Sequence, residues 1–67
     1  MYEWIKATIE CGELIVTYQI EGESKPRSSP HDDEIASDYT DDEIRDLTVV
    51  MLDVPDGQRD MIEVIWN

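Results

Sequence analysis

The sequence predicts a small α+β domain: a four-stranded, mainly antiparallel sheet made of two β-hairpins, with one or two short acidic helices between them. Three observations predict this ββ-α-ββ order. They are a period of two over residues 1–21, a helix-capping motif inside an acidic stretch at 32–47, and a second β-rich stretch at 48–67. Sixty-seven residues are enough for one domain only, so we expect a single domain over residues 1–67.

Residues 1–21 have the alternation of a half-buried hairpin. Apolar side chains occupy every second position in two arms that meet at Cys11 and Gly12. A loop of two or four residues at this point places the apolar side chains of both arms on one face, whereas a slip by one residue loses that face. The expected pairs are Ile5 with Tyr18, Ala7 with Val16, and Ile9 with Leu14.

Residues 48–67 predict a second hairpin. Two runs rich in apolar and β-branched residues flank Pro55-Asp56-Gly57, in which proline presets one turn dihedral and glycine accepts a left-handed one. A three-residue loop here pairs Val50 with Ile62. Both faces of this hairpin are largely apolar, so we expect it to be central in the sheet or covered on a second side.

Between the hairpins, residues 22–31 are rich in Gly, Ser and Pro and predict a flexible loop, and residues 32–47 predict an acidic helical segment. Two helix starts are visible. Ser29 with Pro30 offers an N-cap followed by proline, and Thr40 with Glu43 matches a capping box. Apolar residues such as Ile35 and Ile44 would dock these turns on the sheet.

Charge is the most unusual property of the chain. Seventeen acidic residues oppose five basic ones, which gives a net charge of −12. Such a chain repels phosphate backbones and anionic membranes, so we expect no direct binding to nucleic acid or lipid, while basic protein surfaces are attracted. The single cysteine and the absence of a signal-peptide pattern or a long apolar run favour the cytoplasm, or the host cytoplasm for a phage-encoded protein.

The sequence contains no recognisable catalytic or metal-binding motif. The stretch from Asp32 to Glu43 has acids at several positions of a calcium loop, but Ser37 stands where that loop requires glycine. His31 is the only histidine and lies in a polar segment, and no nucleophile, base and orienting group recur together. We therefore expect no enzymatic activity, no cofactor and no metal.

The candidate functional residues are carboxylates and two aromatic side chains. Asp42 and Asp46 would stand about 6 Å apart along a helix, similar in scale to the phosphate spacing of a duplex. The alternative is a solvated acidic helix face. Trp4 and Tyr2 are candidate apolar anchors on the face opposite Ile5, unless a helix covers that face. The acidic candidates for binding a basic partner are Asp32, Asp33, Glu34, Asp38, Asp41, Asp42, Glu43 and Asp46.

In size, acidity, α+β design and lack of catalytic residues, the chain resembles the phage-encoded inhibitors that mimic DNA: DNA-repair (glycosylase) inhibitors, anti-restriction proteins and anti-CRISPR proteins. That resemblance implies a stoichiometric inhibitor that blocks a basic, nucleic-acid-binding protein or complex. A second class stays open, in which the chain is a structural or assembly module. Such a module would form a homodimer or dock a partner through an apolar sheet face or an exposed strand edge.

Overall fold

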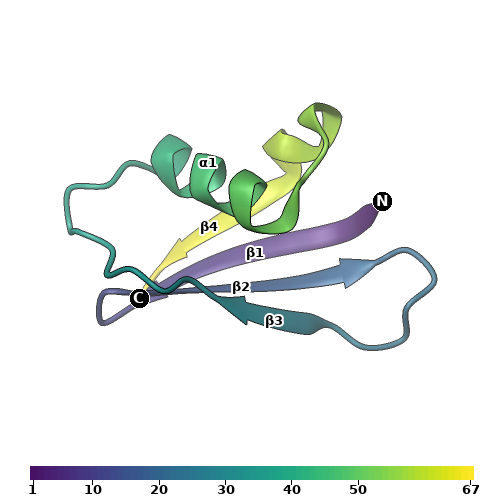
Figure 1. The fold of residues 1–67 in the computed structure, drawn as a ribbon, viewed down its shortest axis with the longest axis horizontal. Helices are drawn as coiled ribbons and strands as arrows, with labels where there is room; N and C mark the ends of the chain where they lie inside the picture. The colour runs from purple at the N-terminus through teal and green to yellow at the C-terminus, as the bar shows by residue number, and fades with distance from the viewer.

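The computed structural model describes residues 1–67, and its sheet has the strand order β3-β2-β1-β4 (Figure 1). The elements are β1 (Tyr2–Glu10), β2 (Glu13–Ile20), β3 (Arg27–Pro30), α1 (Asp41–Leu52), the 3-10 helix η1 (Asp56–Met61) and β4 (Ile62–Trp66). Both helices lie on the same side of the sheet (Figure 1). The predicted α+β class with a four-stranded sheet and a helix between strands is confirmed, although the sheet is mixed rather than purely antiparallel.

The first hairpin is confirmed with the predicted register. Ile5 pairs with Tyr18, Ala7 with Val16, and Ile9 with Leu14. The loop is the two-residue alternative, because Glu10 still pairs with Glu13. Cys11 and Gly12 both have positive φ angles, 52° and 79°, which is the geometry that joins two strands in a tight hairpin.

The predicted second hairpin is wrong. Residues 48–52 are the last part of α1, which ends at Asp53 in the left-handed conformation, with the Asp53 N–H donating to the carbonyl of Val49. Pro55-Asp56-Gly57 leads into η1 instead of a hairpin turn. β4 pairs with β1 in parallel, with Ile62 opposite Ile5. A parallel pair requires a long crossover, and α1 supplies it.

Residues 22–31 are only partly a loop, and the first predicted helix start is wrong. Ser29 and Pro30 belong to β3, which pairs antiparallel with β2 at the edge of the sheet. An edge strand tolerates proline because one of its sides needs no backbone donor. Within the predicted helical segment 32–47, the helix begins only at Asp41, so its first nine residues form an irregular connection.

The core lies between the sheet and α1. Its buried apolar residues are Ile5, Ala7, Ile9, Leu14, Val16, Ile35, Ile44, Val54 and Ile62. The expected docking of Ile35 and Ile44 on the sheet is confirmed. Thr48 is also buried, and its hydroxyl donates to the carbonyl of Ile44 at 2.9 Å, so no polar side-chain atom is buried without a partner.

The opposite face of the sheet has no element packed on it. Its side chains, which we call the open face, are those of Trp4, Lys6, Thr8, Glu10, Glu13, Ile15, Thr17, Gln19, Ser28, Pro30, Glu63 and Ile65. None of its three large apolar side chains packs against the core. The helix-covered face therefore stabilises the fold, and the open face is left for other contacts.

Candidate partner-binding surface

The acidic helix α1 begins with the predicted capping box, which the structure confirms. The Glu43 N–H donates to the Thr40 hydroxyl at 3.2 Å, and the Thr40 N–H donates to Glu43 Oε1 at 3.2 Å. These two bonds satisfy backbone donors that have no partner inside the helix. The negative charges in this first turn also oppose the positive end of the helix dipole.

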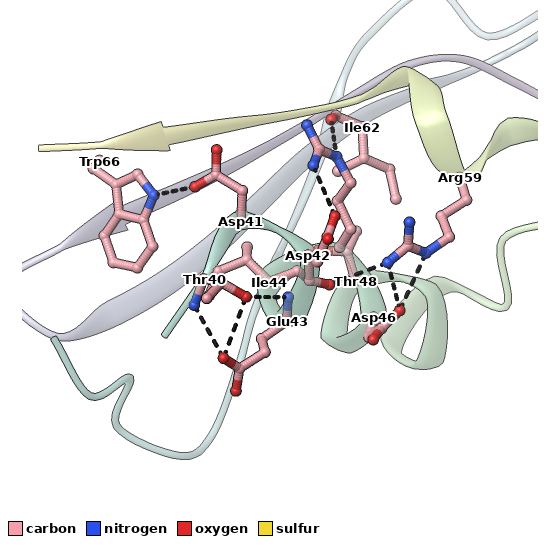
Figure 2. Close-up of polar contacts among 11 residues, drawn as sticks. Thr40, Asp41, Asp42, Glu43, Ile44, Asp46, Thr48, Arg59, Ile62 and Trp66 are labelled. Carbon is pink, nitrogen blue, oxygen red and sulfur yellow. Dashed lines mark hydrogen bonds and ion pairs between the residues drawn. The ribbon is translucent and has the colours of Figure 1, made fainter. Parts of the chain in front are cut away.

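Two other acids of α1, Asp41 and Asp46, are engaged by neighbouring elements (Figure 2). Trp66 Nε1 donates to Asp41 Oδ1 at 2.7 Å and joins β4 to the start of the helix. Arg59 donates to Asp46 Oδ1 from Nε at 3.1 Å and from Nη2 at 2.8 Å. This hydrogen bond is the main cause that raises the pKa of the Arg59 guanidinium above its usual value.

Asp42 is linked to Arg45, whose Nη1 lies 3.4 Å from Asp42 Oδ1. Arg45 also donates from Nε to the carbonyl of Ile62 at 3.2 Å. The arginines and acids of α1 therefore hold the helix against η1 and the first residue of β4. Because the helical carboxylates serve this architecture, part of their charge is compensated inside the chain.

The acids of the connection between β3 and α1 are different. The carboxylates of Asp32, Asp33, Glu34 and Asp38 make no hydrogen bond or ion pair within the chain. Their backbone is nevertheless fixed to the hairpin. The His31 N–H donates to the carbonyl of Leu14 at 2.9 Å, and the Ile35 N–H donates to that of Gly12 at 2.7 Å.

This connection and the β1–β2 turn enclose a cleft of about 480 Å³. Four carboxylate side chains line it, from Glu13, Asp32, Asp33 and Glu34. The cleft therefore places acids that are far apart in the sequence next to one another. It does not gather three or more side chains in an arrangement able to hold a metal ion.

These features lie at one end of the molecule, where the β1–β2 turn, the start of α1 and the end of β4 meet (Figure 1). The Asn67 N–H donates to the carbonyl of Ile9 here, at 2.9 Å. We call this end the acidic pole. Nine of the seventeen acidic residues form it: Glu10, Glu13, Asp32, Asp33, Glu34, Asp38, Asp41, Asp42 and Glu43. The segments that form it, residues 10–13, 31–43 and 66–67, contain no Lys or Arg.

The predicted aromatic anchors lie far from the acidic pole and on opposite faces of the sheet. The register of β1 shifts between Tyr2 and Trp4, so Tyr2 turns to the helix-covered face and its hydroxyl donates to the carbonyl of Leu52 at 2.7 Å. Burial, followed by the nearby Tyr18 and Asp53, raises the Tyr2 pKa above its usual value. Trp4 stays on the open face, with the Lys6 ammonium 5.6 Å from its ring centroid.

One apolar feature was missed by reasoning from the sequence. A groove of about 300 Å³ runs along the outer side of α1, lined by Tyr39, Glu43, Asp46, Leu47 and Val50. Val50 is 82% exposed, more than any other large apolar side chain. The spacing of Glu43, Asp46, Leu47 and Val50 on one helix face is a signal for this groove, but the apolar and β-branched residues of 48–54 predict a strand instead.

Comparison with protein-family models, with curated proteins and with solved structures found no match to this chain. Neither helix has the length and apolar character that crossing a bilayer requires.

Proposed function

We propose that the protein is a non-enzymatic binding protein that occupies the basic surface of a nucleic-acid-binding protein and thereby excludes the nucleic acid. The observation that carries this proposal is the acidic pole. Six of its carboxylates have no partner within the chain: Glu10, Glu13, Asp32, Asp33, Glu34 and Asp38. No basic side chain from the segments around them offsets their charge.

Physical chemistry favours a basic protein as the partner. A duplex presents one negative charge for about every 1.7 Å of its axis, and proteins that bind it offer matching Lys and Arg. The acidic pole presents nine carboxylates on a protein framework, and the same Lys and Arg side chains can bind to them. The connection is already hydrogen-bonded to the hairpin at His31 and Ile35, so its backbone loses little conformational entropy when a partner binds.

The test begins with capture of partners from a cell extract on the immobilised protein. The captured protein should bind duplex DNA or RNA, and free duplex should release it. Binding should also weaken steeply as salt rises, because charge–charge attraction drives it.

The captured partner then allows a comparison of two charge-reversal variants. Asp32→Lys with Asp33→Lys changes the acidic pole, and Glu3→Lys with Glu21→Lys makes the same charge change at the other end of β1. We expect the first pair to weaken binding more than tenfold and the control pair to have a much smaller effect. Equal losses would show that only the net charge matters, and this would refute the assignment to the acidic pole.

A second candidate function is favoured by the open face. No helix covers Trp4, Ile15 and Ile65, and between them Lys6 stands opposite Glu63. This partly apolar face suits a structural module that forms a homodimer or docks an apolar partner. Light scattering would then show a mass that rises with concentration and changes little with salt, and Trp4→Ser would abolish the rise. A monomer at high concentration would rule out the homodimer.

For either function we place the protein in the cytoplasm, because its one cysteine, Cys11, is exposed and unpaired. Such a thiol is typical of reducing compartments.

A further inference from the structure

We infer that the groove along α1 receives an apolar side chain from a basic segment of the partner, so that recognition combines one apolar anchor with charge. This inference rests on the proposed function, because it names a second contact made with the same basic partner. It differs from that function by predicting that the partner's Lys and Arg are not sufficient for full affinity.

The groove has three apolar side chains, of which Tyr39 and Leu47 also pack against the core while Val50 does not. Leu47 and Val50 lie three residues apart on α1, and Tyr39 approaches from the connection before the helix. The core side of the same helix is formed by Ile44 and Thr48, which are fully buried. Val50 is 82% exposed, so its side chain gains almost nothing from the fold. Valine is also a weaker helix former than Ala, Lys or Glu.

The rim of the groove is acidic. Glu43 and Asp46 both line it, and each uses one carboxylate oxygen for a contact within the chain: Glu43 Oε1 in the capping box and Asp46 Oδ1 with Arg59. The second oxygen of each carboxylate remains available to an incoming Lys or Arg. The rim therefore complements a segment that carries positive charge beside its apolar residue.

The groove is continuous with the acidic pole. Glu43 belongs to both, and the connection that contains Asp38 and Tyr39 leads directly from one to the other. A basic segment can therefore extend from the pole to the groove. A second copy of the chain is a poor occupant, because it would bring its own charge of −12 against the same carboxylates.

The test uses two labelled synthetic peptides with the same number of arginines, one with a central leucine and the other with serine at that position. Fluorescence anisotropy measures their affinity for the full chain. We expect the leucine peptide to bind about tenfold more tightly, which is the gain from burying part of one apolar side chain. Val50→Ser should remove this preference and leave the affinity for the serine peptide unchanged.

The matched control is Ile65→Ser, which removes an apolar side chain from the open face. The Ile65→Ser variant should keep the tenfold preference for the leucine peptide. In a separate measurement on the wild type, the leucine peptide should shift the amide NMR signals of Leu47 and Val50. Circular dichroism checks that both variants are folded. Equal affinity of the two peptides for the wild type, or a preference lost only in Ile65→Ser, would overturn the inference.

The same peptides separate this inference from the proposed function. If both bind equally and Asp32→Lys with Asp33→Lys weakens both, the acidic pole stands and the groove is refuted. If the leucine preference persists but those pole substitutions change neither affinity, the groove stands and the proposed role of the pole is refuted.

Discussion

Replacing Tyr2 with phenylalanine removes one hydroxyl that ties the start of β1 to the end of α1. That hydroxyl donates to the carbonyl of Leu52 at 2.7 Å, and Leu52 is the last residue of the helix, where carbonyls have no partner inside the helix. A hydrogen bond of this kind contributes about 1 kcal/mol. For a domain of this size, we expect Tyr2→Phe to lower the melting temperature by about 4–8 °C at neutral pH.

The raised pKa of the same hydroxyl predicts that stability depends on pH with a defined sign. Burial, with Tyr18 and Asp53 nearby, raises the Tyr2 pKa in the folded protein, so the folded state holds this proton more tightly than the unfolded state does. The tighter hold on this proton contributes to the free energy of unfolding. That contribution is fully present below the Tyr pKa of the unfolded state, about 10, and is lost as the pH rises through the higher pKa of the folded state. The advantage of the wild type over Tyr2→Phe should therefore shrink above about pH 10.

Urea unfolding followed by circular dichroism, at a series of pH values, measures both effects. Tyr39→Phe is the control, because the Tyr39 hydroxyl has no hydrogen-bond partner in the chain and its loss should change stability little. The reasoning is refuted if Tyr2→Phe is as stable as the wild type at neutral pH. It is also refuted if the difference stays constant or grows as the pH is raised.

Three further changes test the fold. Thr40→Ala should cost about 1 kcal/mol in urea unfolding because it removes the cap on the Glu43 N–H, and Thr40→Ser should restore most of it. Gly12→Ala should destabilise more than Gly22→Ala: both glycines have positive φ, but only at Gly12 does an added Cβ lie 3.1 Å from Glu34 Oε1. Raising the ionic strength from about 0.01 M to about 0.1 M should raise the melting temperature of the wild type, because screening relieves self-repulsion at −12. A melting temperature that stays constant or falls as the ionic strength rises would show that the charges are compensated locally.

The first hairpin and the start of α1 were predictable because their signals are local. Alternation around Cys11 and Gly12 specifies the register without reference to the rest of the chain, since any slip moves the apolar side chains to the wrong face. The capping box at Thr40 and Glu43 likewise uses bonds between residues three positions apart. Neither signal depends on tertiary contacts.

The second half of α1 was mistaken for a strand for a physical reason. Residues 47–52 are a short, mostly apolar run with β-branched members, and its period alone does not separate a strand from a buried helix segment. A helix that has begun at Asp41 extends easily because each added residue gains one hydrogen bond. The parallel position of β4 is also not encoded locally, because it depends on how α1 crosses the sheet.

The candidate site was predictable in composition but not in arrangement. The acidic residues between Asp32 and Asp46 were identified from the sequence, and the structure divides them into helical acids with internal partners and loop acids without them. That division depends on Arg59 and Trp66, which are distant in the sequence from the carboxylates that they contact. The separation of Tyr2 from Trp4 depends on a single irregularity in β1, for which the sequence carries no signal.

The parallel pairing of β4 with β1 also determines how the chain folds. The β1–β2 hairpin needs only neighbouring residues and can form within microseconds. By contrast, the backbone of Tyr2 and the side chain of Gln58 bond across a separation of 56 positions, so much chain entropy is lost before β1 gains its second neighbour. We therefore expect the docking of β4 to limit the folding rate. Until it docks, one edge of the central strand can pair with another chain, so aggregation should begin at this edge.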